Sequence, residues 1–221
     1  MTVSSRPRAV QIRYVAALVA LVAIWLAMLL WGRGPLDGTI YEALYAGSHP
    51  ALVAIARFFT LLGEPTVLIA AGVLCALWLW HAGHRHLPWV LIAITMVGRG
   101  VAEVQKLSIA RARPDLEPHL VVVQTSSFPS GHATSSMIFY LTIALTLTAG
   151  TRWHRPAAAA AILLSLLVGI SRVMLGVHWP SDVVGGWAFG LLWVLLTLRL
   201  SQRLLQTDVP ESAHPRVERS S

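Results

Sequence analysis

The sequence predicts an all-α, polytopic membrane protein, and its composition, its long apolar runs and the placement of its charges all indicate this class. Of the 221 residues, 56% are hydrophobic and only 12% are charged, whereas about 25% of residues are charged in soluble domains. A helix needs about 20 mostly apolar residues to cross a bilayer. Six runs approach that length, so we predict six transmembrane helices, at roughly Val15–Trp31, Thr66–Trp80, Leu87–Ile109, Ala133–Ala149, Ala157–Leu175 and Val183–Leu198.

The first run follows three arginines, and a basic stretch also precedes the apolar core of a cleaved signal peptide. That alternative fits less well, because Val15–Trp31 is longer than a usual signal-peptide core. The following WGRGPLDG also lacks an A-x-A-like cleavage site. We therefore expect the first run to remain as a membrane span.

Residues 40–63, between the first two runs, are largely apolar but are interrupted by a histidine, a proline, an arginine and a glycine. Two interpretations remain open here. The segment could form a helix that lies in the outer membrane interface. Alternatively, Pro50–Leu62 begins the second span early.

The positions of the basic residues predict the orientation. Cytoplasmic loops carry an excess of lysine and arginine. If the six runs alternate in direction, ten of the seventeen basic residues fall on one side, which we therefore expect to be the cytoplasm: Arg6, Arg8, Arg13, Arg85, Arg152, Arg155, Arg199, Arg203, Arg216 and Arg219. Both termini would then be cytoplasmic. We expect an integral protein of a bacterial inner or plasma membrane, with the opposite loops facing outside.

The remaining composition bounds the organisation of the chain. We expect one six-helix membrane domain over residues 1–205 and a polar, disordered tail over residues 206–221. The net charge of +7 follows the membrane topology, so we expect no nucleic-acid partner and no obligatory protein partner. The single cysteine, Cys75, excludes an intramolecular disulfide framework.

The first of three polar motifs, KLSIARARP, closes the third run. Lys106 can extend its ammonium to the interface from the helix end, and Pro114 stops any helix soon after two arginines. Taken alone, this motif is typical of charged anchors at a membrane surface.

The second motif, PSGH, directly precedes the fourth run. Ser130 is a candidate N-cap, and Gly131 would let the backbone approach a ligand closely. Free amides at a helix start can hold an anion. A capped helix start alone would explain Ser130 and Gly131, but it would leave His132 unexplained.

The third motif, SRVMLGVHWPSD, joins the last two runs. Asp182 follows His178 by four residues, so on one helical face its carboxylate could accept a ring N–H of His178 and raise the basicity of the other nitrogen. Such an imidazole is a base or a nucleophile. A simple polar turn is the plainer interpretation.

All three motifs fall on the same side of the membrane, at the outer ends of spans three to six. Together they supply the cations Lys106, Arg113 and Arg172, the amides of a helix start, and two histidines. A phosphoryl group in transfer needs several fixed donors around its charged oxygens. The combination therefore favours phosphoryl transfer.

The spacing Lys106-x6-Arg113-Pro114, then Pro129-Ser130-Gly131-His132, then Ser171-Arg172-x5-His178-x3-Asp182 resembles the three-part signature of the type 2 phosphatidic acid phosphatase superfamily. No signature position is missing, and the six-span layout is similar to the integral-membrane branch of that family. The resemblance implies a lipid phosphatase with no cofactor. Substrates implied by it include undecaprenyl diphosphate, phosphatidylglycerol phosphate, phosphatidic acid and lipid A phosphates.

The resemblance also implies a role for each matching residue. His178 would be the nucleophile that takes the phosphoryl group, and Asp182 would orient and activate it. His132 would protonate the leaving group and then help to activate water. The phosphate oxygens would be held by Lys106, Arg113, Arg172, Ser130 and Gly131.

Three further expectations concern metal binding and the charged residues near the motifs. We expect no catalytic metal, because the three cations would repel a divalent ion and the outer loops carry no carboxylate or cysteine cluster near the motifs. Arg111 lies outside the signature, so we expect at most a head-group contact. Arg99 and Glu103, four apart inside the third span, are expected to neutralise each other.

Three other functions compete with a lipid phosphatase. Soluble vanadate-dependent haloperoxidases carry the same signature, but six spans argue against that branch. A transporter would use the intramembrane Arg99 and Glu103 but would leave the three motifs unexplained. A phosphatase of soluble phosphate esters has the same chemistry. It is less favoured, because a site at the outer interface suits a lipid whose tails stay in the bilayer.

Overall fold

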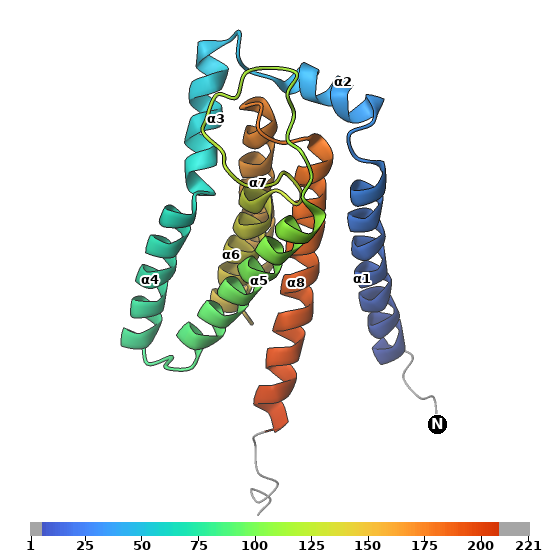
Figure 1. Cartoon of the computed structure of the whole chain (residues 1–221). Helices are drawn as coiled ribbons and strands as arrows, with labels where there is room; N and C mark the ends of the chain where they lie inside the picture. Colours follow the sequence, from blue (N-terminus) through green and yellow to red (C-terminus); the bar gives the residue numbers. More distant parts are fainter. Residues whose placement is uncertain (1–5, 208–221) are drawn as a thin grey trace, which may run out of the picture.

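A computed structural model of the chain describes residues 6–207, and this part is entirely helical apart from turns and loops. Figure 1 shows the helices as a bundle in which the long loop before α6 lies at the end opposite the start of α1 and the end of α8. The eight helices are α1 Arg6–Trp31, α2 Pro35–Leu44, α3 Pro50–Leu62, α4 Pro65–His81, α5 Leu87–Ile109, α6 Gly131–Leu147, α7 His154–Met174 and α8 Pro180–Thr207.

Proline begins four of these helices, at Pro35, Pro50, Pro65 and Pro180. Its fixed φ suits the first helical position, where an N–H would have no partner within the helix. The prolines therefore divide the segment between the first two predicted spans into α2 and α3. They also separate α3 from α4, and the chain bends there by 45°.

Each of the six predicted spans contains a helix. Four helices, α1, α5, α7 and α8, are long and apolar enough to cross a membrane, or five if α3 and α4 form one bent span. Helices α4 and α6 each have 17 residues. This length is at the lower limit of the roughly 17–25 residues that a crossing helix needs, so the count of six spans stays a prediction. Residues 40–63 contribute to α2 and α3, and a bent span formed by α3 and α4 is compatible with the interpretation that Pro50–Leu62 begins the second span early.

Helix α6 lies at the centre of the bundle and packs against α5, α7 and α8. Its side chains Met137, Ile138 and Leu141 are buried against Ile94 of α5 and Val194 of α8. From this central position α6 contacts several other helices of the bundle, and the PSGH motif lies at its start.

Glycines let the helices approach closely at several positions. A side chain at Gly169 of α7 would collide with the ring of Trp187, whose indole N–H donates to Ser165 O at 3.0 Å. Gly98 of α5 likewise leaves room for Trp193, which donates to Ile94 O at 2.8 Å. Small residues at such contacts are typical of helix packing in membranes.

The 110–130 loop is fixed to the ends of the helices by backbone hydrogen bonds. Leu120 N donates to Leu175 O at 3.1 Å, and Ser130 N donates to Asp182 O at 3.0 Å. The loop therefore brings the first two motifs against the third at one end of the bundle. Helix α8 continues to Thr207, past the predicted domain end at residue 205. The rest of the predicted tail, residues 208–221, lies outside the described residues.

Candidate active site

His178 and Asp182 lie at the start of α8, at the end of the bundle that also holds the long loop. His178 Nδ1 is 3.3 Å from Asp182 Oδ2, so the predicted contact is present. The expected shared helical face is wrong, because α8 begins only at Pro180 and His178 precedes it. Asp182 turns back over the helix start and accepts the Trp179 N–H at 2.9 Å, much as an acidic residue does in a capping box.

The Asp182 carboxylate is fully buried and surrounded by donors. Ser127 Oγ donates to Oδ2, and Arg111 Nη1 donates to Oδ1 at 2.9 Å. The prediction that Arg111 makes at most a head-group contact is wrong, because its side chain is buried under the end of α1. Arg111 Nη2 donates there to Met28 O and Leu29 O at 2.8 and 2.7 Å. Arg111 therefore compensates the charge of Asp182.

The hydrogen bonds around His178 fix its tautomer. Arg113 Nη1 lies 3.2 Å from His178 Nε2, and because arginine can only donate, Nε2 must be the acceptor. Nδ1 then carries the proton toward Asp182. Burial lowers the pKa of His178 well below its usual value, and the nearby cations Arg113, Arg172 and Lys106 lower it further. The imidazole is therefore neutral, and its Nε2 lone pair accepts from Arg113, which an incoming phosphate would replace as the partner of this nitrogen.

A cavity of about 400 Å³ lies beside this nitrogen. Lys106 and Arg172, each only 5% exposed, contribute to its wall. Lys106 Nζ donates to Thr125 Oγ1 at 3.2 Å, and Arg172 Nη1 donates to Thr60 Oγ1 at 2.6 Å. No ion pair involves either cation in the part of the chain that the structure describes, so this wall has positive charge available for an anion.

The PSGH motif meets the same cavity through two of its residues, Gly131 and His132. A side chain at Gly131 would lie 3.3 Å from Lys106 Nζ, so glycine keeps the backbone close to this cation. Ser130 holds the N-cap position of α6, but the predicted capping role of its side chain is wrong, because Oγ makes no capping bond. Ser130 Oγ is buried without a partner and does not line the cavity.

Arg172 Nε is also buried without a hydrogen-bond acceptor. An unsatisfied buried donor costs about 1–3 kcal/mol, and more when it is charged. Because Arg172 lines the cavity, an anion bound there would be close to this donor. The arrangement is typical of a site whose ligand is a tetrahedral oxyanion.

Four residues contribute to the site but were not identified from the sequence. Ser127 and Thr125 lie in the polar stretch TSSFPSGH, so their nearness to the second motif was a usable signal. Thr60 and Glu64 come from α3 and the turn after it, more than 40 residues before any motif, and only the fold brings them to the site. Glu64 Oε2 is 2.9 Å from His132 Nε2, which orients the imidazole.

The predicted Arg99–Glu103 pair is wrong. Both residues lie in α5, one turn apart, but no ion pair joins them within residues 6–207. They instead line the same cavity as Lys106 and His178. The same described residues contain no group of three or more histidines, cysteines or carboxylates placed to hold a metal, and the absence of a catalytic metal stays a prediction.

The helical membrane bundle has a cationic cavity beside a neutral histidine. These features define a class of integral membrane protein that can hold a phosphate-like anion next to a nucleophile. The family model described as the PAP2 superfamily matches residues 87–206. The chain belongs to this family, which confirms the resemblance seen in the three motifs.

Individual relatives support the same assignment. The chain is 30% identical over 172 residues to phosphatidylglycerophosphatase B of Bacillus subtilis, covering 76% of this chain and 84% of that protein. It is 36% identical over 124 residues to a lipid A 1-phosphatase of Rhizobium johnstonii, covering 51% of this chain and 48% of that protein. The crystal structure of a transmembrane PAP2-type phosphatidylglycerolphosphate phosphatase from Bacillus subtilis matches with a TM-score of 0.78 at 28% identity, over 85% of this chain and 96% of that one.

Proposed function

We propose that this protein is a membrane lipid phosphatase that hydrolyses its substrate through a phosphohistidine at His178. One observation carries the proposal: the Nε2 lone pair of a neutral histidine borders a cavity lined by Lys106, Arg113 and Arg172. Such a cavity attracts the dianionic phosphate and keeps the attacking nitrogen unprotonated.

In the first step, His178 Nε2 attacks the phosphorus atom of the terminal phosphate. The new N–P bond forms as the P–O bond to the leaving group breaks, and the bond electrons stay on the leaving oxygen. Lys106, Arg113 and Arg172 stabilise the charge on the remaining phosphoryl oxygens, while the Nδ1 proton stays hydrogen-bonded to Asp182. We propose that His132 enters this step as an imidazolium paired with Glu64 and gives one proton to the leaving oxygen, which leaves His132 neutral.

In the second step, water attacks the phosphohistidine. His132 accepts a proton from the water, the N–P bond breaks, and its electrons return to Nε2, so inorganic phosphate leaves and His178 is again neutral. Glu64 assists by holding the His132 ring in place. Every atom in this cycle comes from the substrate, water and the chain itself, so we propose that no metal takes part.

The substrate we propose is a phosphomonoester or diphosphate carried on a lipid. Two relatives, a phosphatidylglycerophosphatase and a lipid A 1-phosphatase, are both named for lipid phosphates. The position of the cavity at one end of a bundle with apolar outer surfaces also supports a substrate that shares the membrane with the protein. Among the possible lipids we favour undecaprenyl diphosphate, since recycling of such a carrier releases it on the outer face.

The test is phosphate release by the purified protein in one detergent, measured on a long-chain prenyl diphosphate, phosphatidylglycerol phosphate, phosphatidic acid and glucose 6-phosphate. We expect kcat/KM for the best lipid to exceed that for glucose 6-phosphate by at least about 10-fold, or about 1.4 kcal/mol. Activity should survive EDTA and should be inhibited by vanadate. Equal or better efficiency on glucose 6-phosphate would overturn the lipid substrate, and loss in EDTA reversed by one metal would overturn the metal-free cycle.

We further propose that the site faces the outside of a bacterial inner membrane. The charge distribution supports this orientation, because ten of the seventeen basic residues fall on the side opposite the motifs if the six predicted spans alternate in direction. In a Cys75→Ala background, Glu117→Cys should react with an impermeant thiol reagent in intact cells, whereas Thr151→Cys should not. Both positions are exposed, so reversed labelling would overturn the orientation.

A further inference from the structure

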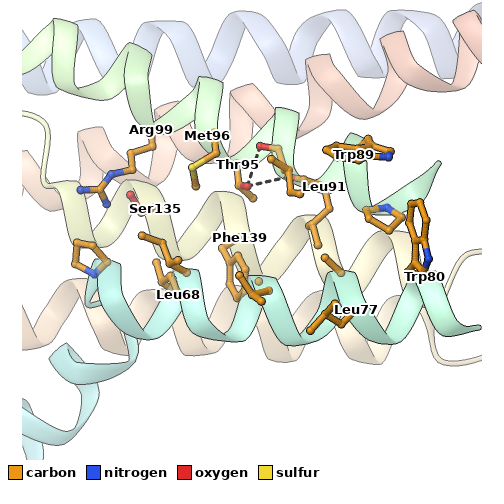
Figure 2. Close-up of a pocket in the computed structure, with 17 residues that line it drawn as sticks. Leu68, Leu77, Trp80, Trp89, Leu91, Thr95, Met96, Arg99, Ser135 and Phe139 are labelled. Atoms are coloured by element: carbon orange, nitrogen blue, oxygen red, sulfur yellow. Dashed lines mark hydrogen bonds between the residues drawn. The ribbon is translucent and has the colours of Figure 1, made fainter. Parts of the chain in front are cut away.

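A second cavity, of about 450 Å³, lies between α4, α5 and α6. Its wall is almost entirely apolar, formed by residues such as Leu68, Leu77 and Phe139. Figure 2 shows Trp80 and Trp89 at one end of this groove and Arg99 at the other. Arg99 follows Trp89 by ten residues along α5, which corresponds to a groove about 15 Å long.

Arg99 belongs to both cavities, because it lines the apolar groove and also the catalytic cavity. It is the only charged residue in the groove within the part of the chain that the structure describes. In Figure 2 its guanidinium points away from the tryptophan end. The groove and the catalytic cavity therefore meet at a cation.

This cation has no partner of its own in the described residues, where neither a hydrogen bond nor an ion pair to its guanidinium is found. Arginine inside a membrane helix is costly and usually marks a function. Arg99, Glu103 and Lys106 follow one another at helical spacing on one face of α5. Arg99 lies about 10 Å along that face from Lys106, and unlike Lys106 it also lines the groove.

We propose that Arg99 binds a second, inner phosphate of the lipid, the one that joins the terminal phosphate to the apolar tail. This inference rests on the proposed function: the terminal phosphate lies beside His178, the tail occupies the groove, and the inner phosphate falls between them. Arginine suits this task because its planar guanidinium binds phosphate through two parallel hydrogen bonds.

Two lipid classes contain an inner phosphate, and Arg99 would act differently on each. In a prenyl diphosphate, the inner phosphate is the leaving group and takes up the electrons of the broken P–O bond, so Arg99 would stabilise charge that develops in the transition state. In phosphatidylglycerol phosphate, the leaving oxygen belongs to glycerol, so Arg99 would contribute to binding alone. Phosphatidic acid and prenyl monophosphates have no inner phosphate.

The test compares the wild-type protein with Arg99→Gln on two matched pairs in the same detergent: farnesyl diphosphate against farnesyl phosphate, and phosphatidylglycerol phosphate against phosphatidic acid. We expect kcat/KM to fall about 10- to 100-fold on the member with the inner phosphate, the range for one lost charge-assisted hydrogen bond. The kcat/KM for the other member of each pair should change less than about 3-fold. Arg99→Gln should lower kcat for farnesyl diphosphate, and it should raise KM for phosphatidylglycerol phosphate.

Val97→Leu, an exposed position on the same helix that lines neither the groove nor the catalytic cavity, is the matched control and should leave both ratios unchanged. Arg99→Lys keeps the charge but not the paired hydrogen bonds, and it should lose a smaller factor on the same substrates. An equal loss by Arg99→Gln on both members of each pair would overturn the inner-phosphate assignment alone. If wild-type protein hydrolysed glucose 6-phosphate but none of the lipids, the proposed lipid substrate would be overturned instead.

Discussion

The two nitrogens of His178 face opposite kinds of environment. On the Nδ1 side, Asp182 is fully buried, and its carboxylate accepts hydrogen bonds from Ser127, Trp179 and Arg111. On the Nε2 side, Arg172 also lies buried, but its Nε has no acceptor. The first side has a donor for each carboxylate oxygen, whereas the second has a buried donor, Arg172 Nε, that lacks an acceptor.

This difference separates two tasks within one site. A fully hydrogen-bonded carboxylate has one stable arrangement, so it can hold the imidazole in a single tautomer and orientation. Cations that lack an anionic partner gain most when an anion arrives, because the ligand then makes the missing bonds. The structure therefore predicts that changes on the Nδ1 side lower turnover, whereas changes on the Nε2 side weaken anion binding.

The largest effect is expected from Asp182→Asn, which keeps the shape of the side chain but removes the acceptor that fixes the tautomer. We expect kcat to fall on the order of 10³–10⁴-fold, as it does when the orienting carboxylate of a catalytic triad is changed in this way. The inhibition constant for vanadate should change less than about 3-fold, because the cations remain. Phosphate-release kinetics with a vanadate titration measure both, and a parallel loss of vanadate binding would contradict the division of tasks.

Arg172→Gln is expected to show the opposite pattern with a smaller loss of activity. Removing one charge-assisted bond to the phosphoryl group should lower kcat/KM by about 10- to 100-fold. The inhibition constant for vanadate should rise by a similar factor, since the same oxygens lose the same donor. Unchanged vanadate inhibition in a folded Arg172→Gln protein would mean that Arg172 does not contact the anion.

Arg111→Lys is a milder change on the Nδ1 side. Lysine keeps the positive charge beside Asp182 but cannot bond Asp182, Met28 O and Leu29 O through one planar group. We expect kcat to fall by about 10-fold with KM unchanged, because the carboxylate loses part of its support. A fall in thermal stability without any change in kcat would assign Arg111 a purely structural role.

The smallest effect concerns the charge of His178. Burial and the neighbouring cations lower its pKa, so the folded protein binds fewer protons at this site than the unfolded chain, whose histidine titrates near pH 6.5. The ring should remain neutral at pH 6, and the stability of the fold should decrease as the pH falls below about 6.5. Ring ¹⁵N shifts of histidine-labelled protein, assigned with His178→Gln, would measure the charge; a protonated ring at pH 6 would contradict it.

The apolar runs were sufficient to predict the helical membrane class, and the three motifs identified six of the residues around the cavity. Lys106, Arg113, Gly131, His132, Arg172 and His178 all meet at one cavity, as expected. The partners of these residues were not predictable in the same way. Thr60 and Glu64 reach the site only through the bend between α3 and α4. No sequence pattern shows which residues of the folded protein lie next to such a bend.

Arg111 and the crossing count show a second limit of the sequence. The signature spacing assigned Arg113 to the phosphate, but nothing in KLSIARARP indicates that Arg111 turns inward to Asp182. This orientation depends on the end of α1, whose carbonyls accept from Arg111. Similarly, apolar composition alone does not show whether α4 and α6, which have 17 residues each, cross the membrane.

The most direct test of the account is to trap the covalent intermediate. With a lipid substrate labelled at its terminal phosphate, His132→Ala protein quenched during turnover should carry an acid-labile, base-stable phosphoryl group on the peptide that contains His178. The same experiment on a protein that also carries His178→Ala should yield no label, and His178→Ala alone should release no phosphate. Near-normal phosphate release by His178→Ala would contradict the central claim that this histidine is the nucleophile.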